Sequence, residues 1–158
     1  MNNNIKISLG VILVIIIGIF AYYYSIKTDP NDILPTPLSS IKGCYVARLS
    51  KDVYTLTILS QSGESFEGTL SFKNFEKDSS SGTYKGTYKD GILLGRYSFQ
   101  EEGMNSVMQV IFKKQGSEFI RGYGALNETG DGFADLNAIT YDSSLPFKAS
   151  KENCAVSL

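Results

Sequence analysis

The chain has 158 residues, a net charge of −1 and neither histidine nor tryptophan. Its length suits one folded domain of ordinary size, and a hydrophobic content of 42% excludes wholesale disorder. The 15 basic residues are scattered, which argues against nucleic acid as a partner, and the lack of histidine removes the commonest general base and metal ligand.

The first predicted element is an uncharged segment over residues 7–26, ISLGVILVIIIGIFAYYYSI, which lies between Lys6 and Lys27. As a helix it would rise roughly 30 Å, which matches the hydrocarbon core of a bilayer. The tyrosines at its end suit the membrane interface. We therefore predict a single-pass transmembrane anchor after a short tail, residues 1–6, with the lipid bilayer as a partner.

Two other interpretations of residues 7–26 stay open. A cleaved signal peptide would have a shorter apolar core and small residues at its cleavage site, where this chain has bulky tyrosines. A buried core helix is the other alternative, although the length and the β-branched residues favour lipid. Basic residues nearly balance across the segment, so they bias its orientation only slightly. We expect the C-terminal domain to lie outside the cytoplasm, at the cell membrane.

Residues 27–42, KTDPNDILPTPLSSIK, contain three of the four prolines of the chain. Proline fixes its own φ angle and disfavours helix at the residue before it, so this composition predicts an extended and fairly stiff linker. The linker would hold the following domain, residues 43–158, a short way from the bilayer.

The two cysteines lie at the two edges of the predicted domain, Cys44 at its start and Cys154 near its end. A disulfide between them would close a loop of about 110 residues and stabilise the fold by roughly 4–5 kcal/mol on the chain-entropy model. Such a bridge needs an oxidising compartment, which agrees with an extracytoplasmic domain. Two unpaired thiols in a cytosolic domain are the alternative, and they would remove the main support for that topology.

From residue 43 onward, apolar and polar residues alternate with a period of two, and no sustained helical period follows residue 27. The runs are separated by short turns rich in glycine and polar residues, so they predict about eight strands with antiparallel neighbours. The fold class is therefore all-β, an N-terminal transmembrane helix followed by a small antiparallel meander. A lipocalin-like barrel is favoured over a sandwich. The clearest runs are 44–49, 52–59, 65–73, 108–113, 118–124 and 133–141.

The segment SSSGTYKGTYKDGILLGRYSF, residues 79–99, predicts a hairpin around Asp90-Gly91, because both central positions of a type I′ turn need a positive φ. Folding the chain there places glycines and aromatic residues on one face. The expected cross-strand pairs on that face are Tyr88 with Leu93, Gly86 with Gly95, Tyr84 with Tyr97, and Gly82 with Phe99.

This alternation favours a packing role, in which bare glycine backbone lets the sheet coil sharply and lets a ring lie over it. The alternative is a notch for a small apolar or sugar-like ligand in a barrel mouth. The segment is not a phosphate-binding loop, because it lacks the strand–loop–helix context. The notch would be lined by Tyr84, Gly86, Tyr88, Gly95 and Tyr97.

The opposite face of the same hairpin pairs Lys85 with Arg96. Like charges directly opposite each other are mildly unfavourable, although solvent on an exposed face makes them tolerable. The alternative is that the two residues contact an anion or an anionic lipid headgroup.

Residues 127–137, NETGDGFADLN, have part of the spacing of a calcium-binding loop and begin with an N-glycosylation sequon. The twelfth position is Ala138, where the calcium motif needs glutamate, so a glycine-rich turn is favoured. We predict no metal site and no cofactor.

The sequence contains no catalytic motif. Its serines, lysines and carboxylates could form the Ser/Lys or carboxylate pair of a hydrolase, but only geometry identifies such a pair. We therefore expect a non-enzymatic, membrane-anchored extracytoplasmic β module that binds a small ligand or an envelope protein. The alternatives are a structural or adaptor domain with a filled barrel and no ligand, and a hydrolase.

Three runs of the chain resemble a recurring type of small bacterial envelope protein, to which no function is assigned. They are GCYVARLSKDVYTLTI, NFEKDSSSGTYKGTYKDGILLGRYSF and EGMNSVMQVIFKK, and Glu152-Asn153-Cys154 follows them near the C-terminus. Proteins of this type begin with an apolar anchor and continue as a single β domain that ends near such a cysteine. The resemblance covers most of residues 43–154. It implies an envelope location and carries over no catalytic or binding residue.

Overall fold

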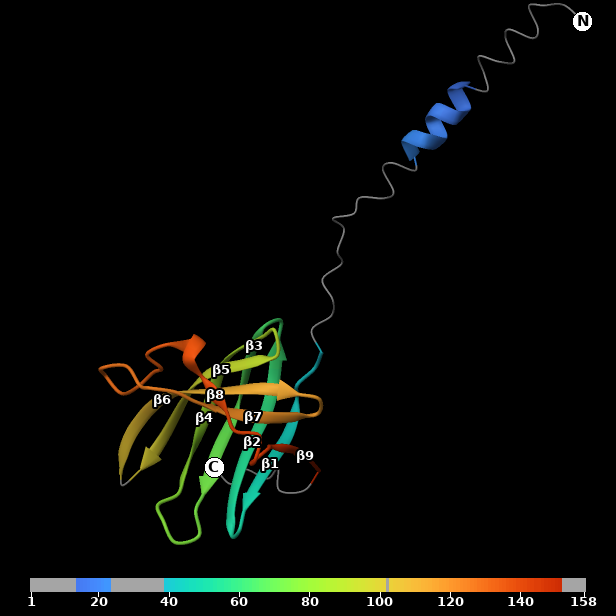
Figure 1. Cartoon of the computed structure of the whole chain (residues 1–158). Coiled ribbons are helices and arrows are strands. Elements are labelled where there is room, and N and C mark those ends of the chain that lie inside the picture. Colours follow the sequence, from blue (N-terminus) through green and yellow to red (C-terminus); the bar gives the residue numbers. More distant parts are fainter. Residues whose placement is uncertain (1–13, 24–38, 102, 152–158) are drawn as a thin grey trace, which may run out of the picture. The chain divides into compact units, whose positions relative to one another are not determined.

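The structure is a computed structural model that describes residues 14–23, 39–101 and 103–151. The chain divides into two units, Met1–Pro37 and Leu38–Leu158. In the first unit, residues 14–23 are helical (Figure 1). The predicted anchor lies partly outside the described residues, and none of the helices described has both the length and the hydropathy of a membrane span.

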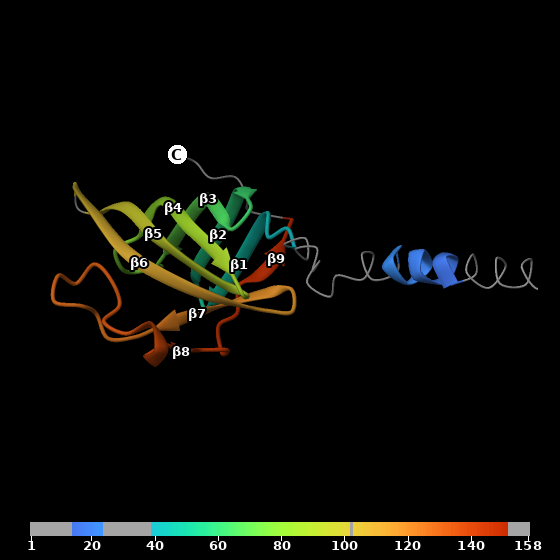
Figure 2. The same ribbon diagram turned by 90° about the horizontal axis from the view of Figure 1, so that it is seen from above.

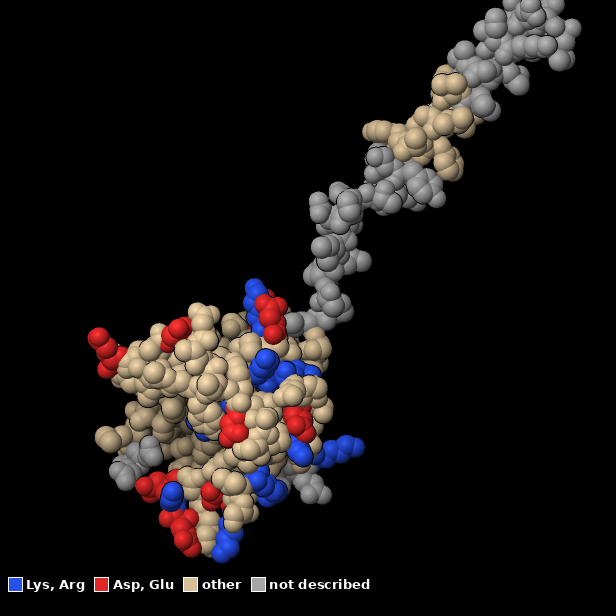
Figure 3. Space-filling view, viewed as in Figure 1, with Lys and Arg blue, Asp and Glu red and all other residues tan. Residues whose placement is uncertain are grey.

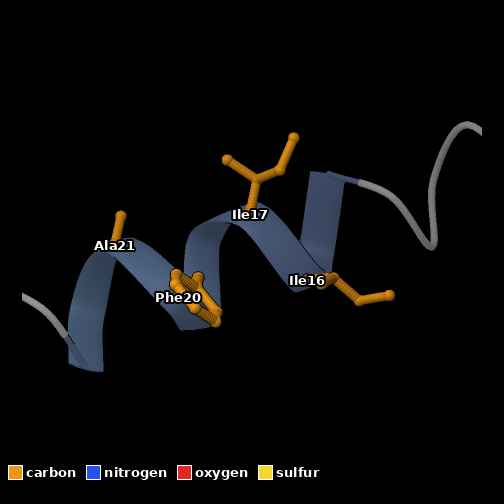
Figure 4. Close-up of a pocket in the computed structure, with 4 residues that line it drawn as sticks. All are labelled: Ile16, Ile17, Phe20 and Ala21. Atoms are coloured by element: carbon orange, nitrogen blue, oxygen red, sulfur yellow. The ribbon is translucent and has the colours of Figure 1, made fainter.

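The helix of the first unit exposes apolar side chains. Ile16, Ile17 and Phe20 are each more than half exposed, and together with Ala21 they project from the helix in Figure 4. Because all four side chains come from one helix, they form an open apolar surface and not an enclosed cavity.

The second unit contains a single antiparallel sheet that curls into a half-barrel (Figures 1 and 2). The sheet order is β8-β7-β6-β5-β4-β3-β2-β1-β9, so the first eight strands form a meander and only β9 returns to the opposite edge. The predicted all-β meander is confirmed, with nine strands in place of about eight. The strands are β1 (Gly43–Leu49), β2 (Asp52–Ser62), β3 (Ser65–Lys73), β4 (Ser80–Lys89), β5 (Ile92–Glu101), β6 (Met104–Gln115), β7 (Glu118–Tyr123), β8 (Thr140–Tyr141) and β9 (Lys148–Ser150).

The run 133–141, predicted as a strand, is mostly a loop. It contains the short 3-10 helix η1 (Leu136–Ala138), and only Thr140–Tyr141 pair with β7. The physical reason is local: the Asp135 side chain accepts a hydrogen bond from the backbone N–H of Asn137 at 2.8 Å and caps η1.

The hairpin between β4 and β5 has the predicted register. Asp90 and Gly91 have φ angles of 50° and 79°, as a type I′ turn requires. The four inward pairs are Tyr88 with Leu93, Gly86 with Gly95, Tyr84 with Tyr97, and Gly82 with Phe99.

The inner face of the curled sheet forms one core in which aromatic rings predominate. Phe112 and Phe147 meet edge to face at 5.1 Å between centroids, and Tyr45 and Phe119 meet in the same way at 4.8 Å. Ile41, from the end of the predicted linker, is fully buried in this core. Its N–H donates to the side chain of Gln61 at 2.9 Å, and its carbonyl accepts from Tyr45 at 3.0 Å. The folded unit therefore includes the last residues of the predicted linker.

One backbone pair joins the two edges of the sheet. The N–H of Phe119, in β7, donates to the carbonyl of Phe147 at 3.0 Å, and the N–H of Phe147 donates back at 2.8 Å. The chain then continues into β9, which pairs with β1. Pro146, just before this pair, lacks an N–H and cannot extend the ladder. The half-barrel is thus linked near the start of β7 and open where β7 ends.

Cys44 is buried in β1, with 5% of its surface exposed. Cys154 lies outside the described residues. The disulfide between them therefore stays a prediction.

Gly86 allows β4 and β5 to approach each other closely. A Cβ atom added there would collide with the carbonyl oxygen of Leu94 and lie 2.5 Å from the Cα of Gly95. We expect Gly86→Ala to lower the free energy of unfolding by about 1–3 kcal/mol, because only backbone atoms could move aside. Urea unfolding followed by circular dichroism measures the change.

The matched control is Thr87→Ala, at the next position, where the side chain is exposed on the outer face. It should change the unfolding free energy by no more than about 0.5 kcal/mol. Equal urea midpoints for the two variants would show that the close approach of β4 and β5 at Gly86 does not constrain the sheet.

Candidate functional site

The open end of the half-barrel is lined by aromatic and apolar side chains that are only partly buried. They lie on the inward-facing rows of their strands, because alternate residues of a strand share a face. Figure 3 shows the domain hollowed in this region, with part of a basic side chain visible inside the hollow. We call this set the mouth; its residues are Tyr54, Phe72, Phe99, Met108, Arg121 and Tyr123.

Arg121 is the charged residue of the mouth. It pairs with Phe112 in the β6–β7 ladder, which places it on the inner face. Its Cζ atom lies 4.4 Å from the ring centroid of Phe72 and 5.1 Å from that of Tyr123. The guanidinium group is therefore held between rings from β3 and β7, an arrangement that stabilises a partly desolvated cation.

None of the carboxylates in the described part of the chain forms an ion pair with Arg121. The four ion pairs found there are Lys85–Glu67, Lys89–Glu64, Arg96–Asp131 and Lys148–Glu118. Ring contacts engage the faces of a guanidinium group, whereas its N–H donors lie in the plane. Arg121 can therefore still donate hydrogen bonds to an anion.

Tyr54 adds a hydroxyl group to the rim of the mouth. It lies 3.4 Å from an Asp52 carboxylate oxygen and 3.3 Å from the amide oxygen of Asn74, so it can donate to either. Burial, followed by the nearby Asp52 charge, raises the pKa of Tyr54, while Arg121 lowers it to a smaller extent. The hydroxyl stays protonated at neutral pH and remains a hydrogen-bond donor.

The residues predicted to line a ligand notch are packed in the core. Tyr84 and Tyr97 have no exposed surface, and Tyr88 is 4% exposed. The Tyr84 hydroxyl donates to the carbonyl of Val110 at 2.8 Å. A Cβ atom at Gly95 would lie 2.7 Å from the Tyr84 ring, so this ring occupies the space above the glycine. Gly86 is the close-contact position between β4 and β5. This geometry agrees with the packing role and leaves no notch at Gly95.

The two like charges Lys85 and Arg96 face each other across β4 and β5 as predicted, and each has a carboxylate partner. Lys85 lies 2.7 Å from Glu67, and Arg96 lies 2.7 Å from Asp131. An acidic group thus lies on the far side of each basic group, Glu67 beside Lys85 and Asp131 beside Arg96, which offsets the like-charge contact. Both basic groups lie on the face opposite the mouth.

The polar residues of the partial calcium motif bond to one another. Asp131 accepts hydrogen bonds from Thr129 at 2.6 Å and Asn127 at 3.2 Å, besides its pair with Arg96. The side chain of Gln109 accepts from the N–H of Phe133 at 3.0 Å. These contacts fasten the loop to the outer face of β5 and β6. The described residues contain no cluster of three or more potential metal ligands.

Our sequence analysis did not single out Arg121. The run 118–124 predicts a strand, and its pattern leaves open which of its residues face the core. Phe119, Arg121 and Tyr123 alternate and therefore share one face. A charged residue between two aromatic residues on an apolar face was the signal that could have identified it.

The hydrogen bonds to Asp131 should make the free energy of unfolding depend on pH in the acid range. Hydrogen bonds from Thr129, Arg96 and Asn127 hold the pKa of this carboxyl well below its ordinary value of 3.8. A carboxyl whose pKa is lower in the folded state than in the unfolded state stabilises the fold. This stabilisation is complete above the unfolded-state pKa and is lost as the pH falls from there toward the folded-state pKa. We therefore expect Asp131→Asn to destabilise the domain at pH 7 and the difference from the wild type to shrink below about pH 4.

Urea midpoints of the wild type and the variant at pH 7, 4 and 2.5 provide the measurement. Glu128→Gln, in the same loop, serves as a control that should follow the wild type at every pH. A difference that stays constant down to pH 2.5 would refute the role of the Asp131 charge.

Comparisons of the chain with protein-family models, curated proteins and solved structures found no match. The resemblance to small envelope proteins therefore stays a prediction from the sequence.

Proposed function

We propose that this chain is a membrane-anchored, non-enzymatic binding module and that its mouth takes a small ligand carrying an anionic group. In this proposal residues 7–26 anchor the chain, and the β domain is a lipocalin-like barrel outside the cytoplasm. The observation that carries the proposal is Arg121, an inward-facing cation between two rings that has no carboxylate partner among the described residues.

The chemistry of Arg121 supports an anionic ligand. A guanidinium group presents paired donors that match a carboxylate or a phosphate, and such charge-assisted bonds are stronger than neutral ones. The residue is partly buried, so a bound anion would be less screened than at the open surface. Tyr54 lies beside the same ring as Arg121, because its own ring is 5.4 Å from that of Phe72, and its hydroxyl can donate to an anion in place of Asp52 or Asn74.

The rings of the mouth support a ligand with a flat apolar part. Phe72 contacts Tyr54 at 5.4 Å and Tyr97 at 5.8 Å between centroids, and Phe99 stacks on Tyr97 at 4.6 Å. Sites lined by rings with one or two convergent polar groups are typical of small-molecule binding.

The filled core limits the size of the ligand. Tyr97 and Phe112 lie beneath the mouth with no exposed surface, so a long apolar tail has no space below it. We therefore propose a compact ligand, such as one aromatic ring or a short chain with a carboxylate or phosphate group, that stays at the open end.

The mouth lies away from the point where the linker joins the domain. In the β1–β2 pair, Gly43 is opposite Ile58 at one end and Leu49 is opposite Asp52 at the other. Tyr54 belongs to the second end. A ligand at the mouth would thus be reached from the side remote from Gly43.

The test is a titration with phenyl phosphate and benzoate as probes, with benzyl alcohol as the neutral analogue. We expect both anions to shift NMR signals of mouth residues and the alcohol to shift them much less. Arg121→Gln should weaken binding at least about tenfold, as loss of a charged hydrogen bond predicts. Arg121→Lys should bind with intermediate affinity, because lysine keeps the positive charge but lacks the paired N–H donors of the guanidinium group.

The matched control is Arg48→Gln, which removes an exposed arginine from β1. This variant should bind the anions like the wild type. If Arg121→Gln also binds like the wild type, or if the alcohol binds as well as the anions, the proposed anion site does not exist.

A second candidate is the adaptor module that takes no small ligand. The complete burial of Tyr84 and Tyr97 favours it, because a packed core is what a purely structural β domain requires. Failure of every probe to shift a mouth signal would select this candidate.

The proposed anchor has its own test. We expect the full chain to stay with membranes after extraction at alkaline pH, because a transmembrane helix is held by hydrocarbon and not by charge. A chain that lacks residues 7–26 should be released. Release of the full chain at alkaline pH would contradict the anchor without affecting the mouth.

A further inference from the structure

The first half of β6 has a free edge. On one side, β6 pairs with β5 from Met104 to Lys113. On the other side, its ladder with β7 begins at Gln115 and ends at Phe112. Figure 2 shows β6 continuing past the end of β7. Residues 104–108 therefore have a neighbouring strand on one side and, among the described residues, none on the other.

Two hydrogen bonds of β6 show which of its backbone groups face the free edge. The N–H of Lys114 donates to the turn before β5 at 2.7 Å, so the even-numbered residues of β6 face β5. The odd-numbered residues face the other way, and the N–H of Gln109 accordingly donates to Asp131 at 2.8 Å. Asn105 and Val107 thus present their N–H and C=O groups at the free edge, where no other described residue forms a hydrogen bond with them.

This edge lacks the features that keep a free edge from pairing. Natural sheets protect such edges with charged side chains, proline, bulges or very short strands. Residues 104–108, MNSVM, include neither a charge nor a proline, and their pairing with β5 has no register shift. Met104 is 67% exposed and Val107 is 43% exposed. An unprotected apolar edge of this kind is a template on which an extended peptide can add as a further strand.

The free edge borders the mouth. Met108, a mouth residue, and Ser106 alternate on the inner side of β6, and Ser106 pairs with Phe99. Tyr123 is the last residue of β7, and Arg121 lies against its ring. A strand added to β6 would take the place that β7 leaves free, so its inward side chains would lie beside Met108 and point toward Arg121.

We propose that the free edge of β6, residues 104–108, binds an extended peptide segment of a partner protein and that this segment carries an acidic residue. The backbone of the segment pairs with Asn105 and Val107, and its acidic side chain turns inward to Arg121. The acidic contact rests on the anion site of the proposed function, whereas the strand addition does not.

The free stretch limits the length and the charge of the bound segment. Five residues of a strand span about 17 Å, and the contact of Asp131 with Gln109 ends the stretch on one side. The paired part of the segment is therefore about five residues long. An inward acidic residue complements Arg121, which has no carboxylate partner among the described residues.

The first test is amide hydrogen exchange of the full chain, followed by NMR. We expect the amides of Asn105 and Val107 to exchange at least about tenfold faster than those of Ser106 and Met108, because only the latter two donate to β5. Equal protection of Val107 and Ser106 would overturn the free edge. Protection of Val107 that rises with protein concentration would assign the edge to a second copy of the chain and overturn the peptide.

The second test uses a defined probe, the acetylated and amidated peptide Val-Thr-Glu-Thr-Val. Its valines and its glutamate share one face, and its symmetry makes the strand direction unimportant. We expect the peptide to shift the amide signals of Asn105 and Val107 and to slow exchange at Val107. Glutamine in place of its glutamate should weaken binding at least about tenfold, because a charged hydrogen bond is lost.

Two results of this titration would contradict the proposal. Absence of any shift at Asn105 and Val107 at millimolar peptide would overturn the strand addition. Equal affinity for the glutamate and glutamine peptides would overturn the contact between the acidic residue and Arg121.

Val107→Pro separates the edge from the anion site. The N–H of Val107 points away from β5, so proline removes no bond of the sheet and the domain should stay folded. We expect this variant to bind the peptide at least about tenfold more weakly and to bind benzoate like the wild type. The matched control is Val107→Thr, which keeps the N–H and a β-branched side chain and should bind the peptide like the wild type.

The variants also distinguish the two proposals from each other. Unchanged peptide binding by Val107→Pro would overturn the edge contact even where benzoate binds at Arg121. If benzoate does not bind the wild type but the peptide binds and is lost in Val107→Pro, the anion site fails and the strand addition holds.

Discussion

The backbone pair between Phe119 and Phe147 is the constraint on which the other features of the domain depend. The two residues exchange both of their hydrogen bonds and so link β7 to the segment that enters β9. The edge of β1 thereby gains a partner, which removes an exposed row of backbone groups from that strand. The same link fixes the start of β7 and, two residues further along, directs Arg121 into the open end.

Curling the sheet enough to make this link requires bare backbone on the inner face. Gly86 and Gly95 face each other across β4 and β5, and the ring of Tyr84 fills the space above Gly95. Side chains at these two positions would hold the strands apart and expel the ring. The glycines are therefore the reason why a nine-stranded sheet can coil around an aromatic core.

The packed core and the proposed binding site are separated along the axis of the half-barrel. Near the link at Phe147 the interior is filled, and at the other end the rings become partly exposed and surround a cation. A charge at this depth has a desolvation cost, which the Phe72 and Tyr123 rings offset in part. This position leaves the cation where the anion of the proposed function would reach it.

The sequence alone determined the features that depend on neighbours along the chain. Alternation with a period of two predicted an antiparallel meander, and the φ preference of Asp90-Gly91 predicted the register of a whole hairpin. The same reasoning placed Lys85 opposite Arg96, and the structure adds that Glu67 and Asp131 neutralise them. Such features could be read from the sequence because turn chemistry and strand pleating act over a few residues.

Only the tertiary structure decided what depends on distant residues. The closing pair joins Phe119 to Phe147. Phe147 follows Pro146, and the residues before it have no strand-like pattern in the sequence. The alternation in β4 and β5 favoured a packed core over a ligand notch, and the ring of Tyr84 above Gly95 agrees with the packed core. Arg121 became a candidate site residue only when Phe72, nearly fifty positions earlier, was found against it. Sheet curvature determines which side chains meet across the interior, and it is a property of all the strands together.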